Sequence, residues 1–110
     1  MLNLTTRRSF IESLPHGQLC VEIGVARGAF AEVILRGMQP LRLWLVDCWT
    51  EQSHDVDPAS APQADHDANY CQTRERFASY PQVEILREFS TVAARRFDDS
   101  SLELVYIDGN

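Results

Sequence analysis

The order of apolar runs and helical patterns constrains the fold of this chain more than any other feature of its sequence. Compact apolar runs, of the kind that buried strands show, alternate with segments whose apolar residues recur at helical spacing. The expected strands cover residues 19–23, 41–46, 83–86 and 102–107. One helix precedes the first strand and one separates each strand from the next, an order that builds a parallel sheet. The sequence therefore predicts an α/β fold with a doubly wound parallel sheet.

Capping residues and helix breakers set the expected helix boundaries. The helices are expected to begin at Thr5 or Thr6, Gly28, Ala68, and Ser90 or Thr91, and Gly37 with Pro40 ends the second. Between the second strand and the third helix, residues 50–69 contain two prolines, two histidines and four aspartates. This composition predicts a long acidic surface loop, and a loop of this length is usually functional or mobile.

Composition narrows the class of protein. The 110 residues allow a single domain, spanning residues 1–110, and 45% hydrophobic residues argue against disorder. A net charge of −6 disfavours a general nucleic-acid binder. No apolar run approaches the ~20 residues of a membrane span, and residues 1–10 lack the apolar core of a secretory signal. The three cysteines, Cys20, Cys48 and Cys71, have no metal-type spacing, which indicates reduced thiols in a cytoplasmic protein.

The strongest local motif is the segment EIGVARG, residues 22–28, between the first strand and the second helix. Gly24 permits a tight turn and close approach of a ligand, and Gly28 lets the helix pack near the strand. The amides at the start of the helix would then face the ligand. Ala26 stands where a dinucleotide fingerprint has its middle glycine, so a nicotinamide or flavin site is disfavoured. The alternative is a generic strand–helix turn.

Asp47 closes the second strand and adds a second feature of a nucleoside site. It follows Gly24 by 23 positions, close to the ~20-residue offset at which such sites place a carboxylate on the ribose hydroxyls. The alternative is a solvated aspartate at a strand end. Together, the glycine turn and Asp47 predict a site for a nucleoside without a pyrophosphate.

Four motifs, CVEIGVARGAF, LWLVDCW, VEILREFS and LELVYIDGN, occur in this order and spacing. In this respect the chain resembles the class I S-adenosylmethionine-dependent methyltransferases, most closely the group that includes macrocin-type sugar O-methyltransferases and related small-molecule enzymes. The resemblance covers the chain from about Leu19 onward. It implies a Rossmann-like sheet of order 3-2-1-4, S-adenosylmethionine as cofactor, and O-methylation of a small or sugar-like acceptor.

The resemblance also implies roles for individual residues. The implied cofactor-binding residues are Glu22, Gly24 and Gly28 at the methionine end, Asp47 at the ribose, and Phe89 and Ser90 beside the adenine. Asp108 follows the fourth strand, near the site of methyl transfer, and is expected to act as a base or to bind Mg²⁺. Its alternative role is that of a turn former before Gly109.

Each of the remaining candidate site residues has two possible interpretations. Arg27 either pairs with the carboxylate of the cofactor or is solvent-exposed, and Trp49 either walls the adenosine or packs in the core. The loop side chains, His54, Asp55, Asp57, His66 and Asp67, fit no tight metal-ligand spacing, although the loop could form a lid over the cofactor. An acidic pocket would suit the cationic sulfonium of S-adenosylmethionine.

Methyltransferase domains of this group continue past the fourth strand, so the expectation is a truncated domain that holds the cofactor half. The fourth strand would then be an exposed edge through which two copies can pair. Two other functions stay open: another nucleotide-binding α/β enzyme, such as a dehydrogenase, and a non-catalytic module that oligomerises through its open sheet edge.

Overall fold

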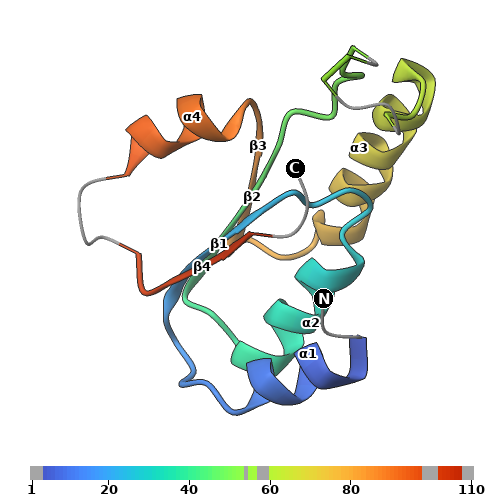
Figure 1. The fold of residues 1–110 in the computed structure, drawn as a ribbon. Coiled ribbons are helices and arrows are strands. Elements are labelled where there is room, and N and C mark those ends of the chain that lie inside the picture. The colour runs from blue at the N-terminus through green and yellow to red at the C-terminus, as the bar shows by residue number, and fades with distance from the viewer. Residues whose placement is uncertain (1–3, 54, 57–59, 98–101, 108–110) are drawn as a thin grey trace.

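Four parallel strands form the centre of the structure, in the order β3-β2-β1-β4 (Figure 1). The computed structural model of the chain describes residues 4–53, 55, 56, 60–97 and 102–107. Its elements are α1 (Leu4–Glu12), β1 (Leu19–Ile23), α2 (Ala29–Met38), β2 (Arg42–Asp47), α3 (Gln63–Phe77), β3 (Val83–Arg87), α4 (Ser90–Ala93), the 3₁₀ turn η1 (Ala94–Arg96) and β4 (Leu104–Ile107). The predicted strand order 3-2-1-4 is thus confirmed.

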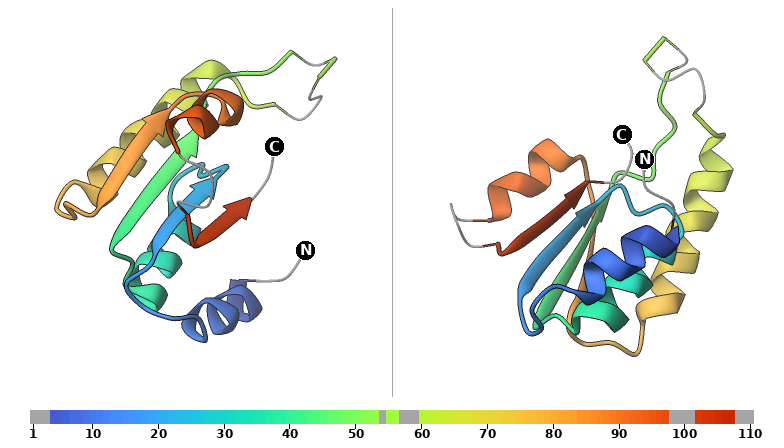
Figure 2. Two further views of the ribbon diagram at one scale, coloured as in Figure 1. Left: turned by 90° about the vertical axis from the view of Figure 1, so that its left-hand side faces the viewer. Right: turned by 60° about the horizontal axis from the view of Figure 1, so that its bottom comes forward.

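Helices cover both faces of this sheet, as the alternation of elements predicted. Figure 2 shows α1, α2 and α3 on one face and α4 on the other. Since each strand pairs in parallel with its neighbour, all four strands point the same way. Their carboxyl ends therefore lie along one edge of the sheet, where doubly wound folds bind their ligands.

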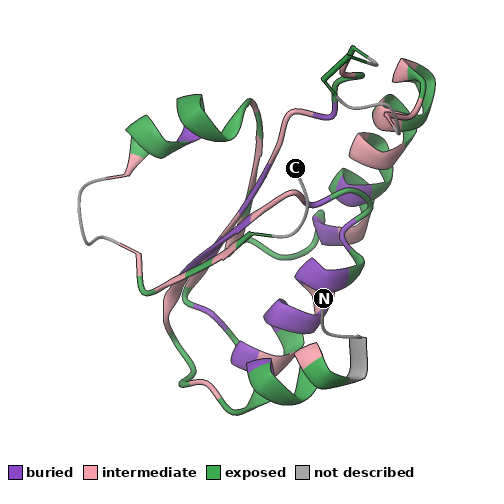
Figure 3. Cartoon of the chain, in the orientation of Figure 1, coloured by how far each residue is buried: buried purple, intermediate pink, exposed green. Residues whose placement is uncertain are grey.

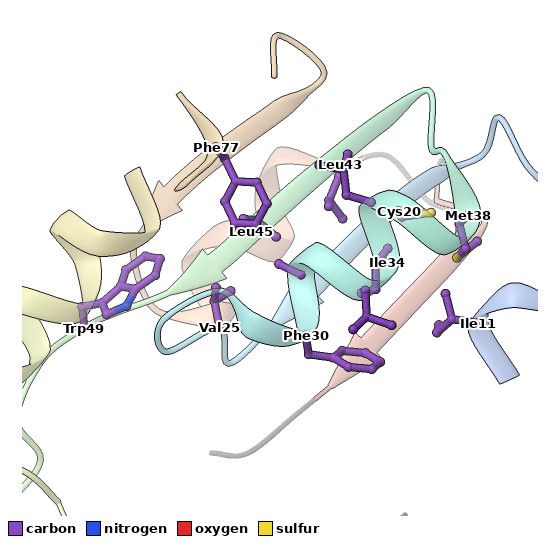
Figure 4. Packing of buried hydrophobic residues seen from close by; sticks show 13 residues of the cluster. Ile11, Cys20, Val25, Phe30, Ile34, Met38, Leu43, Leu45, Trp49 and Phe77 are labelled. Atoms are coloured by element: carbon purple, nitrogen blue, oxygen red, sulfur yellow. The ribbon is translucent and has the colours of Figure 1, made fainter. Parts of the chain in front are cut away.

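Alternating side chains along the strands divide the core into two layers. The larger layer lies under α1, α2 and α3 and includes Cys20 on β1 and Leu45 on β2 (Figure 4). The smaller layer lies under α4 and is built around Val21, Val46 and Ala93. This two-residue period is what a strand covered on both faces requires, and it explains why the strands read as nearly continuous apolar runs.

Helix α2 supplies more of the larger layer than any other element, because six of its residues are buried: Phe30, Ala31, Val33, Ile34, Leu35 and Met38. Gly37 lies inside this helix rather than at its end. A Cβ at Gly37 would stand 3.0 Å from Cγ2 of Ile11, so the glycine allows α1 and α2 to approach closely. The helix ends at Met38, and Gln39 caps it in a left-handed conformation with φ of 47°.

Several predicted boundaries are wrong by a few residues. Helix α1 begins at Leu4, so neither threonine lies at its N-cap, and Phe89 rather than Ser90 or Thr91 precedes α4. The largest error concerns α3, which starts at Gln63 rather than Ala68 and shortens the expected loop 50–69 to residues 50–62. Pro62, with φ of −59°, precedes the helix, a place where its missing N–H costs nothing.

The sheet is less covered on the α4 side and along β4. Helix α2 is mostly buried, whereas α4 buries only Ala93 (Figure 3). On β4, Val105 is 49% exposed and Ile107 is 68% exposed, and β1 is its one neighbour among the described strands. None of the helices described in the structure is long and apolar enough to cross a membrane.

Candidate functional site

The predicted site lies at the carboxyl edge of the sheet, where the turn between β1 and α2 meets the end of β2. The amide of Gly24 donates to the carbonyl of Val46 over 2.9 Å, which continues the β1–β2 pairing into the turn. Three residues of this turn have positive φ: Gly24 at 87°, Ala26 at 56° and Gly28 at 86°. The turn thus folds back on itself tightly before α2 begins, as the glycines predicted.

Gly28 serves both the conformation of this turn and its packing. A Cβ at this position would stand 2.8 Å from Cε2 of Phe77 on α3, closer than real contacts allow. The left-handed φ also disfavours any residue with a Cβ. Ala26 takes up a left-handed conformation without being glycine, which costs about 1 kcal/mol and must be offset by its surroundings.

Asp47 supplies part of that compensation, because its carboxylate binds the backbone of the turn. Its Oδ2 accepts hydrogen bonds from the amides of Val25 (2.9 Å) and Ala26 (3.0 Å), and its Oδ1 accepts one from Trp49 (2.9 Å). An ionised carboxylate offers about four acceptor positions. Once the donors among the described residues are counted, one position on Oδ1 remains. Asp47 is therefore a structural anchor of the turn in addition to being the candidate ribose ligand.

Trp49 lies in the core, which corresponds to the packing alternative. Its side chain is 1% exposed, and its ring lies 5.1 Å from the ring of Tyr70. Figure 4 shows it at the end of the buried cluster near Val25 and Phe77. Its indole Nε1 donates to the carbonyl oxygen of Ala26 over 2.8 Å. In this conformation the ring is not available to stack on a ligand.

Thr73 on α3 is a residue that the sequence did not single out. It is fully buried, and its hydroxyl lies 3.0 Å from the carbonyl oxygen of Ala26. The buried residues of α3 are Thr73 and Phe77, and both contact the turn. A lone threonine in a polar helix has no periodic signal, so only the tertiary contact with Ala26 identifies it.

The start of α3 is attached to the end of β3 by a second cluster that sequence reasoning missed. Arg87 donates to Oδ1 of Asp67 over 2.6 Å and to the carbonyl of Trp49 over 3.1 Å. The side-chain amide of Gln63 also donates to both of these oxygens. In addition, the backbone N–H of Gln63 donates to the side chain of Glu51, and the backbone N–H of Glu51 donates to the side chain of Gln63, each over 2.8 Å. Hydrogen bonds from Gln63 and Arg87 hold the pKa of Asp67 below its usual range.

The other implied cofactor residues lie in different surroundings. Glu22 is a fully buried carboxylate on β1, paired in register with Leu45 and Tyr106. Arg27 is exposed, and its side chain makes no ion pair with the described residues. The amide of Glu88 donates to the carbonyl of Asp47 over 3.1 Å, which brings the turn after β3 to the same edge.

Phe89 and Ser90 follow in that turn and are both exposed, Phe89 to 53%. Their exposure leaves them free to meet a ligand. Asp108, the candidate base or metal ligand, lies outside the described residues. Within the residues that are described, no group of three His, Cys, Asp or Glu side chains could hold a metal ion. The part of the chain that the structure describes thus gives no support to a Mg²⁺ site.

Cys20 is not a candidate nucleophile. Cys20, Cys48 and Cys71 are all free. Burial, with a smaller contribution from the nearby Glu103 carboxylate, raises the pKa of Cys20 to about 11, so this thiol is protonated at neutral pH and is inert.

A surface groove of about 570 Å³ lies elsewhere and is lined mainly by residues of α1 and α2. It is lined by both signs of charge, including Arg8, Arg76, Glu12 and Glu32. None of the predicted site residues lines it, so the groove and the predicted site are separate features.

Comparisons with known proteins bear on the fold. No model of a known protein family matches the sequence, and no curated protein matches it. Among solved structures, the chain is similar to spermidine synthase in complex with the transition-state analogue AdoDATO, with a TM-score of 0.57 and 15% identity over 91% of this chain. It is also similar to a "putative methyltransferase" from Thermoplasma acidophilum, with a TM-score of 0.55 and 15% identity over 100% of this chain.

The chain spans 30% of the first of these proteins and 42% of the second. At this level of identity the likeness concerns the fold. The four-stranded parallel sheet of order 3-2-1-4, flanked by helices, is accordingly a Rossmann-like fold that these two solved structures share.

Proposed function

We propose that this chain carries the cofactor-binding half of an S-adenosylmethionine-dependent methyltransferase. The observation that supports this most strongly is the arrangement at the carboxyl edge: a tight glycine turn after β1 lies directly beside an aspartate that ends β2. Both structural neighbours have the same fold, and one of them is solved with the analogue AdoDATO. In such folds the ligand lies at this edge.

The chemistry of the edge suits an adenosyl sulfonium. Asp47 keeps one acceptor position on Oδ1, so it would accept one ribose hydroxyl while it still holds Val25, Ala26 and Trp49. Two hydroxyls, as the spacing alone suggested, would require it to release an amide. A carboxylate at this edge favours a cationic ligand such as the sulfonium.

Ala26 disfavours the alternative of a dinucleotide enzyme. Its methyl group is exposed on the turn, at the position where a pyrophosphate needs glycine for close approach of the backbone. A dehydrogenase would need this close approach, which the Ala26 side chain obstructs.

S-adenosylmethionine, when bound, supplies an electrophilic methyl group on a sulfonium. The residues of this chain bind and orient it: the turn and Asp47 at the methionine and ribose ends, and exposed Phe89 with Ser90 beside the adenine. Orientation is the main contribution that a protein makes to such an in-line displacement. We further propose an oxygen atom of a small or sugar-like molecule as the acceptor, with Asp108 as the base that removes its proton.

Calorimetric titration tests this proposal directly. We expect the chain to bind S-adenosylmethionine and not NAD, and Asp47→Ala to weaken binding by about tenfold or more, since a hydrogen bond to a charged group contributes roughly 1.5–3 kcal/mol. Asp55→Ala is the matched control, because Asp55 is an exposed carboxylate of the loop. Equal heats for the parent chain and Asp47→Ala would contradict the ribose assignment, and binding of NAD alone would favour the dehydrogenase.

A further inference from the structure

We propose that Thr73 and Trp49 are positioning residues for the cofactor turn: they hold the Ala26 carbonyl inward and thereby aim the Arg27 amide at the ligand. This inference rests on the proposed function, since it names the backbone donor that the turn would present to S-adenosylmethionine.

The Ala26 carbonyl oxygen accepts hydrogen bonds from two buried side chains. Trp49 donates from Nε1 over 2.8 Å and Thr73 from its hydroxyl over 3.0 Å. Trp49 is 1% exposed and Thr73 is fully buried. The Thr73 hydroxyl also lies 2.8 Å from the carbonyl of Asn69, and it has one proton to share between the two acceptors. Although Ala26 is an exposed residue, its carbonyl oxygen is thus bound by side chains of the core.

Peptide geometry transmits this constraint to the next residue. In a planar trans peptide the C=O of one residue and the N–H of the next point in opposite directions, and no cis peptide occurs among the described residues. With the Ala26 carbonyl directed toward Trp49 and α3, the N–H of Arg27 is directed away from them, toward the side on which Arg27 is exposed.

The other amides of the turn already have acceptors. Gly24 donates to the carbonyl of Val46 and Gly28 to that of Val25, and Asp47 accepts from Val25 and Ala26. Within residues 24–28, this leaves the amide of Arg27 without an acceptor among the parts of the chain that the structure describes. An exposed, oriented and unused N–H is what a ligand carboxylate requires.

The carboxylate of the methionine group is the acceptor that this donor fits. It is anionic at neutral pH, and the exposed guanidinium of Arg27 would add an attractive charge beside it. Helix α3 contributes to the same turn by packing, because a Cβ on Gly28 would contact both Phe77 and Thr73. The position of the turn is therefore coupled to the docking of α3.

Three variants and one control test the role of the two donors. Thr73→Val keeps the volume of the side chain and removes the hydroxyl, and Trp49→Phe keeps an aromatic ring and removes the indole N–H. We expect each to weaken calorimetric binding of S-adenosylmethionine by about three- to tenfold. Thr73→Ser should bind within about twofold of the parent chain. Thr50→Val, which removes a hydroxyl that donates to Cys48 instead of Ala26, should leave binding unchanged.

A ligand-free measurement separates this inference from the proposed function. The residual dipolar coupling of the Arg27 N–H bond reports its orientation, and we expect it to change in Thr73→Val and to be restored in Thr73→Ser. If the parent chain binds S-adenosylmethionine and Thr73→Val and Trp49→Phe bind equally well, the positioning role is wrong and the proposed function stands. If the parent chain does not bind, the proposed function is wrong, and equal Arg27 couplings in the two Thr73 variants would also overturn the positioning role. If Thr73→Val does not fold, the binding titration and the Arg27 coupling are both measured on Trp49→Phe instead.

Discussion

Gly28 shows how a single residue connects the backbone of the cofactor turn to the packing of α3. Its left-handed φ of 86° and the 2.8 Å approach of a Cβ to Phe77 exclude a side chain for two independent reasons. Gly17 has a similar φ of 75° but open space around it. A side chain at Gly17 would therefore meet backbone strain alone, whereas one at Gly28 would meet both strain and a steric clash.

We expect Gly28→Ala to lower the free energy of unfolding by about 2–4 kcal/mol, the sum of left-handed strain and overpacking. Gly17→Ala should lower it by about 1 kcal/mol, from strain alone. Urea-induced unfolding of both variants measures the difference. Equal losses would show that α3 moves away from Gly28 without cost.

Phe89 is the residue whose exposure best fits contact with a ligand, since it is 53% exposed and precedes α4. We expect Phe89→Ala to weaken binding of S-adenosylmethionine by about three- to tenfold through lost aromatic stacking, with little change in melting temperature. Val92→Ala, which removes an exposed apolar side chain one helical turn further on, serves as the control. Unchanged affinity in Phe89→Ala would contradict a place for Phe89 beside the adenine.

At the scale of elements, α3 is unusual because it is polar along most of its length and buries only Thr73 and Phe77. Its N-terminal half is held by hydrogen bonds: Asp67 and Gln63 link it to Arg87 at the end of β3 and to the carbonyl of Trp49. The ring of Tyr70 adds a cation–π contact, with the guanidinium of Arg87 4.5 Å from its centre. The helix is thus anchored at two places, one of them apolar and one charged.

The charged anchor makes stability depend on pH in the acidic range. The pKa of Asp67 lies below its ordinary 3.8 in the folded chain, because hydrogen bonds from Gln63 and Arg87 favour the carboxylate. The folded state therefore holds fewer protons than the unfolded state, and this stabilisation is complete well above pH 3.8 and is lost as pH falls through the folded pKa.

We expect Asp67→Asn to flatten the decline in stability below about pH 4, measured by urea unfolding at a series of acidic pH values. Asp65→Asn removes a carboxylate from the first turn of α3, two residues before Asp67, and is the control. If both variants decline as steeply as the parent chain, the Asp67–Arg87 contact makes no contribution to the stability of the folded state.

At the scale of the whole molecule, one face of the sheet is covered by α1, α2 and α3. The other face is covered by α4 alone among the described helices (Figure 2), and it leaves part of β4 exposed. The two outward side chains of β4, Val105 and Ile107, are 49% and 68% exposed. Exposed apolar strand residues at a sheet edge favour pairing with another chain. Self-association through β4 is therefore the second candidate property of this chain.

We expect the sedimentation coefficient of the chain to rise with concentration and Val105→Lys to suppress this rise, because a charge on the β4 surface opposes edge pairing. Leu41→Lys introduces the same charge at another exposed apolar residue, 64% exposed and outside β4. Equal suppression by both variants would show that net charge rather than the β4 surface controls association.

The strand order and the glycine turn could be predicted because both are local. Apolar runs and helix breakers mark the four strands, and β1 occupies residues 19–23 as expected. The start of α3 could not be predicted from the polar residues before Ala68. It is set by Glu51 and Gln63, whose reciprocal hydrogen bonds join positions twelve residues apart.

The sequence by itself determined the alternation of elements, the parallel sheet and the place of Asp47 beside the turn, because periodicity and strand ends are properties of contiguous residues. Only the tertiary structure decided what Asp47 and Trp49 do there. Asp47 binds backbone amides of the turn, and Trp49 turns into the core to meet Ala26 and Tyr70. The partner of Ala26 on α3, Thr73, lies 47 residues along the chain. Such partners are brought together by packing between distant segments, so no pattern of neighbouring residues predicts them.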